Sequence, residues 1–260
     1  MSSRARRHPP RRPRIQVAPP RGQAAAPPEH VTDALEMARP LPETTAALDA
    51  EMIVSDAAGW CALQEMVRAA GGERPGDLFD AGADDRAWGE LVTAASARPS
   101  RRGVALLRGM AAVLPGESGE RAASAVRATP DPYVPAWYPA ITDLRVTTCW
   151  YGEAADNAAY AFLLAAYTYG DGEPHAVALS VDHANGGVAK DVFVAAGADI
   201  EVTRDRLSGF CEAFGEVDAA TAHGHLADAY AAAARSEYAM DDAVYSLRVL
   251  CARRVREFAG

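Results

Sequence analysis

The sequence has little lysine, few cysteines and no long apolar segment. One of its 26 basic residues is a lysine, Lys190, and the rest are arginines. The four cysteines are far apart and form no C-x-x-C pair, which argues against a zinc ribbon and a thioredoxin-type redox site. No run of about 18 apolar residues and no apolar signal-peptide core occurs. These absences predict a cytoplasmic protein with reduced thiols and no membrane partner.

Common catalytic and metal-binding motifs are also missing. The sequence contains no H-E-x-x-H, no G-x-S-x-G and no Walker A pattern. His223 and His225 are two residues apart and would point to different sides of a helix. His175 and His183 would be separated by roughly 27 Å of strand, too far to share one metal ion. We therefore expect no metal site and no cofactor.

Charge divides the chain into a basic start and an acidic body. Residues 1–30 hold seven arginines and one glutamate, a net of +6, whereas the remaining 230 residues carry a net of −15. The proline-rich segment 1–36 is predicted to be disordered, and Met37 or Met52 is an alternative start. An arginine arm can bind nucleic acid. This arm lacks aromatic residues for stacking, and the acidic body repels phosphate, so nucleic-acid binding is disfavoured.

Hydrophobic periodicity predicts a helical region over residues 37–129. Ser100 is a suitable N-cap for one of its helices. The helices are expected at residues 45–70, 84–97, 100–114 and 119–128. Four prolines in residues 130–140 then argue against a helix, and the aromatic residues between them predict a packed connection.

The longest of these predicted helices, residues 45–70, has an amphipathic pattern. Large apolar side chains recur near every 3.6 residues and are expected to face the core. Ser55 and Asp56 are expected on the opposite, polar side. Gly71 follows and ends the helix. The apolar stripe consists of Leu48, Met52, Trp60, Leu63 and Val67.

Residues 141–260 are predicted to form a small antiparallel sheet followed by helices. Runs of β-branched and aromatic residues favour a meander of three or four strands. The strands are expected at residues 144–151, 160–169, 175–183 and 188–195, and the helices at 203–214, 218–236 and 241–258. Thr203, Asp218 and Asp241 are candidate caps of these helices. The predicted fold class is therefore α+β, with a helical N-terminal half, a small meander and a helical C-terminus.

The hairpin of residues 182–191 holds the densest cluster of reactive side chains. Asn185 and Gly186 predict a two-residue turn. With that register, His183 and Lys190 become diagonal neighbours on the apolar face of the sheet. A partly buried lysine has a lowered pKa and can act as a base or a nucleophile.

Two interpretations of this hairpin stay open. In the first, the protein is an enzyme in which His183, Lys190 and Asp191 are the acid–base groups, and Asp182 and Asn185 contact the ligand. In the second, Lys190 reaches water at the end of the sheet and Asp182 accepts backbone hydrogen bonds in the turn. We favour the second because short motifs often mislead. The expected function is a non-catalytic module that binds a protein or a small molecule.

The stretch from His175 to Ala195, HAVALSVDHANGGVAKDVFVA, resembles a segment of a cytosolic protein family of high-GC Gram-positive bacteria. The family pattern is V-D-H-N-x-G-G-x-x-K-D-x-F-V, from which Ala184-Asn185 departs. The matching residues are Asp182, His183, Gly186, Gly187, Lys190, Asp191, Phe193 and Val194. The resemblance implies a helical N-terminal half, a small sheet and a helical end over residues 37–260, and it implies no activity.

Overall fold

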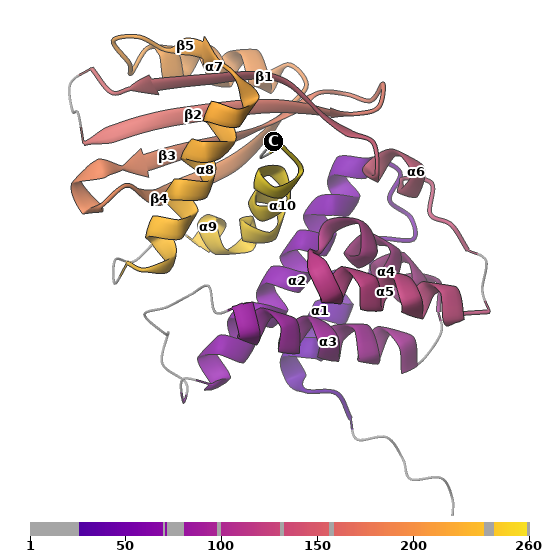
Figure 1. Ribbon diagram of the computed structural model, residues 1–260. Helices are drawn as coiled ribbons and strands as arrows, with labels where there is room; N and C mark the ends of the chain where they lie inside the picture. Colours follow the sequence, from indigo (N-terminus) through magenta and orange to yellow (C-terminus); the bar gives the residue numbers. More distant parts are fainter. Residues whose placement is uncertain are drawn as a thin grey trace, which may run out of the picture.

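The computed structural model of the protein is an α+β structure with a helical N-terminal half, an antiparallel sheet and a helical C-terminal part (Figure 1). This architecture confirms the predicted fold class. The structure describes residues 26–69, 71, 81–97, 100–130, 133–155, 159–236 and 242–258. No transmembrane helix is found in these ranges, since every helix there is too short or too polar for a bilayer core.

The N-terminal half is built from helices, of which the last four lie close to their predicted positions. They are α1 (Glu29–Met37), α2 (Ala47–Ala69), α3 (Ala81–Ala97), α4 (Arg101–Val113) and α5 (Gly116–Ala128). Ser100 caps α4 as predicted, because its side chain accepts a hydrogen bond of 3.1 Å from the amide of Gly103. Gly71 follows α2 with a φ of +75°, the left-handed conformation in which helices often end.

Helix α1 lies within the segment that the sequence predicted to be disordered. Disorder was predicted up to residue 36, whereas α1 begins at Glu29 and buries Val31 and Ala34 completely. The prediction was wrong for residues 29–36 because a helix of nine residues shows too little periodicity and is stabilised mainly by its neighbours. Residues 1–25 lie outside the described residues.

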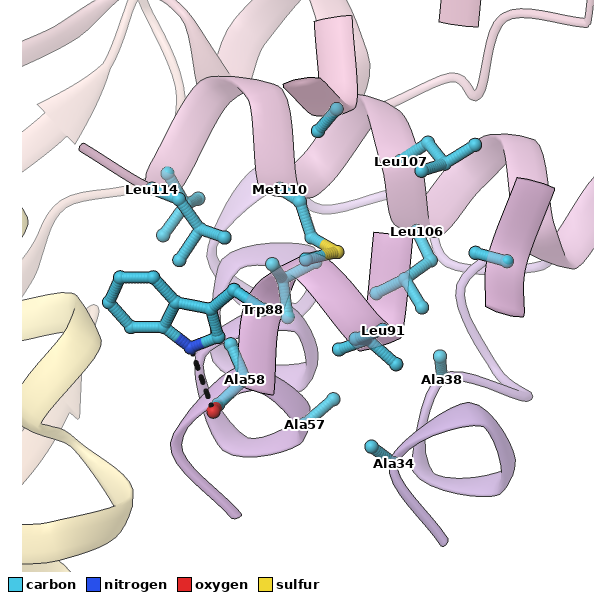
Figure 2. Packing of buried hydrophobic residues seen from close by; sticks show 14 of the residues in the cluster. Ala34, Ala38, Ala57, Ala58, Trp88, Leu91, Leu106, Leu107, Met110 and Leu114 are labelled. Atoms are coloured by element: carbon cyan, nitrogen blue, oxygen red, sulfur yellow. Dashed lines mark hydrogen bonds between the residues drawn. The ribbon is translucent and has the colours of Figure 1, made fainter. Parts of the chain in front are cut away.

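The helical half has a core of its own (Figure 2). Trp88 of α3 is inserted against α2 and donates its indole N–H to the carbonyl oxygen of Ala58 at 3.1 Å. Leu91 of α3 and Met110 of α4 lie in the same cluster. A side chain at Gly109 would place its Cβ 2.4 Å from Val54, so the close approach of α4 to α2 requires glycine.

The proline-rich connection packs against the helical half, as expected from its aromatic residues. Trp137 is fully buried and donates its indole N–H to the carbonyl oxygen of Leu41 at 3.0 Å. Against expectation, a short helix, α6 (Tyr138–Ile141), forms here with Pro139 in its first turn. Proline is tolerated there because the first amides of a helix have no intrahelical acceptor.

The sheet has the strand order β4–β3–β2–β1–β5, with antiparallel neighbours throughout. The strands are β1 (Leu144–Glu153), β2 (Tyr160–Tyr169), β3 (His175–Asp182), β4 (Val188–Ala196) and β5 (Gly215–Val217). The first four form the predicted meander. The sequence missed β5, because three residues are too few to show the alternation of a strand.

Helices cover both faces of the sheet (Figure 1). They are α7 (Asp199–Ser208), α8 (Ala219–Ala234), α9 (Asp242–Ser246) and α10 (Arg248–Phe258). Helix α7 packs on one face, and α8 crosses the other, where α9 and α10 lie between the sheet and α2. Asp218 caps α8 as predicted, since its side chain accepts the amide N–H of Thr221. Thr203 is inside α7 and does not cap it, and Asp241 lies outside the described residues.

Candidate functional site

A five-residue loop closes the 182–191 hairpin in place of the predicted two-residue turn. Residues His183–Asn185 form a short 3-10 helix, η1, and the next two glycines have φ values of +86° and +77°. The carboxylate of Asp182 starts the loop, because it accepts the backbone N–H of Asn185 at 3.2 Å. The predicted two-residue turn is therefore wrong, whereas the expectation that Asp182 accepts a backbone hydrogen bond in the turn is confirmed.

A β-bulge at Lys190 changes which side chains share a face of the sheet. Asp191 pairs with Ser180 as predicted, but Ala189 takes the place of Lys190 opposite Val181. Lys190 is the extra residue of the bulge, and its ammonium lies 3.6 Å from the Asp182 carboxylate. The predicted placement of Lys190 beside His183 on the apolar face is therefore wrong.

Asp182, Asn185, Lys190 and Tyr160 form a cluster in which the polar groups bond one another. Asn185 donates its side-chain N–H to Asp182 at 2.8 Å, and Lys190 donates to the hydroxyl of Tyr160 at 2.8 Å. Burial opposes ionisation of Asp182, but hydrogen bonds from Asn185 and the charge of Lys190 outweigh it and lower the pKa of this carboxyl. This arrangement is typical of a structural cluster that holds a hairpin loop in place.

His183 and Asp191 do not join this cluster. Both side chains are exposed, and neither makes a hydrogen bond or ion pair with the described residues. The structure thus brings Asp182, Asn185 and Lys190 together and leaves out two of the three predicted catalytic residues. A catalytic role of His183, Lys190 and Asp191 stays a prediction.

A second polar cluster is buried between the helical half and the sheet. The Arg254 guanidinium donates two hydrogen bonds of 2.8 Å to the carboxylate of Glu51, and it also donates to Tyr169 and His175 at 3.0 Å. Arg253 donates to Glu51 from the other side at 3.0 Å. Burial and the nearby Arg254 charge lower the pKa of His175 to about 3. None of these side chains is more than 4% exposed, so the cluster is sealed from ligands and joins α2, α10 and the sheet.

The other histidines considered in the sequence also lie apart. His223 is buried, with its Nε2 2.9 Å from the hydroxyl of Tyr167, whereas His225 stacks on Tyr151 with ring centroids 4.0 Å apart. The two imidazoles therefore diverge, as their spacing predicted. Among the residues that the structure describes, no group of three or more His, Cys, Asp or Glu side chains is arranged to hold a metal ion.

A pocket of about 380 Å³ opens between α2 and α9, and we call it the α2–α9 pocket. Met37 at the end of α1 lies at its edge, and both Met37 and Trp60 are 38% exposed there. Gly59 of α2 faces α9, since a Cβ at this position would be in van der Waals contact, at 3.4 Å, with the carbonyl oxygens of Tyr245 and Ser246. The described residues that line the pocket are Met37, Asp56, Gly59, Trp60, Leu63, Ala243, Tyr245 and Ser246.

Of the lining residues that the structure describes, one is acidic, Asp56, which is half-buried. Within the described ranges no side chain or amide donates a hydrogen bond to its carboxylate, and no ion pair involves it. Burial raises the pKa of Asp56 to about 6. A carboxylate in this setting is only partly hydrated and has no hydrogen-bond or ion-pair partner. This favours a ligand that carries a hydrogen-bond donor or a positive charge.

Trp60 and Asp56 do not lie where the sequence predicted. Trp60 was expected to face the core but is 38% exposed, and Asp56 was expected on the opposite, polar side of the helix, whereas Leu63 packs against the core as predicted. In the structure these side chains line one pocket, because positions i, i+4 and i+7 share a helix face. The spacing D-x-x-G-W-x-x-L from Asp56 to Leu63 is the signal that could have identified them.

Comparisons with protein-family models, with curated proteins and with solved structures give no match to this chain. The family resemblance of the hairpin therefore stays a prediction, and the function has to be inferred from the geometry.

Proposed function

We propose that the protein is a non-catalytic module that binds a small ligand, and that the α2–α9 pocket is its binding site. The observation that carries this proposal is the lining of the pocket, where exposed Trp60 and Met37 lie near the unpaired carboxylate of Asp56. Ligand sites usually combine a mainly apolar lining with a few polar groups that orient the ligand, in pockets of about 300–1,000 Å³. The α2–α9 pocket has this composition, and its volume lies at the lower end of that range.

The two other polar clusters are less suited to binding a ligand. In the hairpin, Asp182, Asn185 and Lys190 already bond one another, and the cluster around Glu51 and Arg254 is closed to solvent. A ligand at either place would have to replace existing hydrogen bonds before making its own, at little net gain. For this reason the enzyme interpretation of the hairpin ranks second.

The proposal is tested with two small probes, 2-phenylethylamine and 2-phenylethanol, and the full-length protein. We expect the NMR signals that shift on titration to be those of residues lining the α2–α9 pocket. Trp60→Ala should weaken binding of the tighter probe at least fivefold, because it removes the aromatic wall. Phe210→Ala is the matched control, since Phe210 is also an exposed aromatic residue (51%) but does not line the pocket.

Three results would overturn the proposal. One is that neither probe binds at millimolar concentration. Another is that the shifted signals belong to residues 182–191 and not to the pocket. The third is that Trp60→Ala and Phe210→Ala reduce the affinity equally, because binding would then not depend on this site.

A further inference from the structure

We infer that the ligand of the α2–α9 pocket is a small organic cation, an amine with an apolar or aromatic body. This inference rests on the proposed function and adds the chemical class of the ligand. It follows from the charge of the pocket, from the aromatic side chain beside that charge and from the charge of the folded body.

The charge of the pocket is negative and has no counterion within the described residues. Among the described lining residues, Asp56 is the acidic group and none is a lysine or arginine. Tyr245 of α9 is the other titratable side chain in this described set, and it is 5% exposed. Glu36, on α1, and Arg39, just after it, lie close to Met37 in sequence but pair with each other at 2.6 Å. A bound ammonium group would therefore be the natural partner of the Asp56 carboxylate.

The aromatic side chain next to Asp56 suits the same ligand. Trp60 lies one helical turn after Asp56 on α2, so both side chains reach the pocket from the same helix face. Indole is the side chain that attracts a cation most strongly over its ring face. The ammonium group can thus contact the carboxylate and the indole together, while its apolar body contacts Leu63 and Met37.

Other ligand classes fit the pocket less well. An anion would meet the Asp56 carboxylate at short range and the net charge of −15 of residues 31–260 at long range. A neutral apolar ligand would displace water from Asp56 without supplying a partner, and an unpaired buried charge is costly. A cation avoids both penalties, because the acidic body attracts it and its charge pairs with the carboxylate.

The test compares ligands that differ in charge but have similar shape. Binding of 2-phenylethylamine, 2-phenylethanol and phenylacetate to the full-length protein is measured by calorimetry or NMR titration at pH 7.5 and low salt. We expect the amine to bind about tenfold more tightly than the alcohol, from one ion pair and one cation–π contact. The anion should bind more weakly than the alcohol.

Variants of two acidic residues of α2 supply the control. Asp56→Asn should lower the affinity for the amine to that for the alcohol and should not lower the affinity for the alcohol. Asp49→Asn removes an exposed carboxylate of the same helix that does not line the pocket, and it should leave both affinities unchanged. For the amine, affinity should also fall as the pH is lowered below about 6, whereas that of the alcohol should not fall.

The outcomes separate the inference from the proposed function. If the alcohol binds in the pocket as tightly as the amine, the inference is wrong and the binding module stands. The same holds if Asp56→Asn and Asp49→Asn lower the amine affinity equally. If none of the three ligands shifts signals of the pocket, both the inference and the proposed function are wrong.

Discussion

Replacing Asp56 by asparagine is expected to stabilise the folded protein at neutral pH. Asp56 has a pKa of about 6 in the folded state, compared with an ordinary value of 3.8, because it is half-buried and unpaired. Between these two pH values the folded state holds a proton that the unfolded state has lost, so stability falls as the pH rises from 3.8 to 6. Above pH 6 the full penalty of the buried charge is present.

The size of the effect follows from this difference in pKa. Each pKa unit corresponds to about 1.4 kcal/mol, and water screens a side chain that is only half-buried, so less than half of the nominal value is expected. We therefore expect Asp56→Asn to raise the free energy of unfolding by about 1 kcal/mol at pH 7.5, where the carboxylate is charged. At pH 3.5 the carboxyl of the natural residue is protonated, and the two proteins should be equally stable.

Urea unfolding followed by circular dichroism at both pH values measures this effect. Asp49→Asn is the matched control and should change stability little at either pH, because its carboxylate is exposed. A variant that is less stable than the natural protein at pH 7.5 would refute the reasoning, because Asp56 would then have a stabilising partner. Equal stabilisation at both pH values would refute it as well, because the charge would not be the cause. A residue that destabilises the fold is expected at a binding site, where function is retained at the expense of stability.

Three further predictions concern the buried network and the hairpin. Glu51→Gln should lower the free energy of unfolding by about 3 kcal/mol, since it leaves the buried guanidinium of Arg254 without a carboxylate and Arg253 with Glu257 alone. Glu117→Gln is the control at an exposed ion pair and should lower the free energy of unfolding by less than about 0.5 kcal/mol. If urea unfolding shows that the two variants lose equal stability, burial of the ion pair does not cause the loss. The pKa of His175 is about 3 in the folded state, compared with an ordinary value of 6.5. Between pH 6.5 and pH 3 the imidazole is therefore protonated in the unfolded state and neutral in the folded state, so stability falls as the pH is lowered through this range. His175→Phe should reduce that pH dependence in urea titrations, and an unchanged slope would show that another group causes it. Lys190→Met should lower the free energy of unfolding by about 1 kcal/mol, because it removes the cation that pairs with Asp182 and leaves the hydrogen bonds from Asn185. It should leave amine binding unchanged in calorimetry, and a large loss of affinity would instead favour the hairpin as the site.

The longer helices of the N-terminal half and the four strands of the meander were predictable from the sequence because local patterns determine them, whereas α1, α6 and β5 were not predicted. Ser100 and Asp218 are caps whose side chains bond the first turn of their helices, and both act as the sequence indicated. The details of the hairpin were not predictable in the same way. The bulge at Lys190 depends on how β4 pairs with β3 after a five-residue loop, and it moves Lys190 to the face of Asp182. A shift of one residue in register reverses the two faces of a strand, so sequence reasoning about which groups meet fails at such a point.

The pocket was missed for a reason that lies in the alanine content of α2. Sequence reasoning placed the large side chains of this helix in the core, but its buried face consists mostly of small residues, including Ala50, Ala57, Ala58 and Ala62. Small side chains let neighbouring helices approach closely, as Gly109 of α4 does against Val54 of α2. The most closely packed face of α2 is therefore its alanine-rich face, which has few large apolar residues. The larger residues of the predicted stripe are then left half-buried or exposed, and Trp60 and Leu63 line the α2–α9 pocket. The stripe of α2 is thus divided, because Leu48, Met52 and Leu63 pack against the core whereas Trp60 is exposed at the pocket.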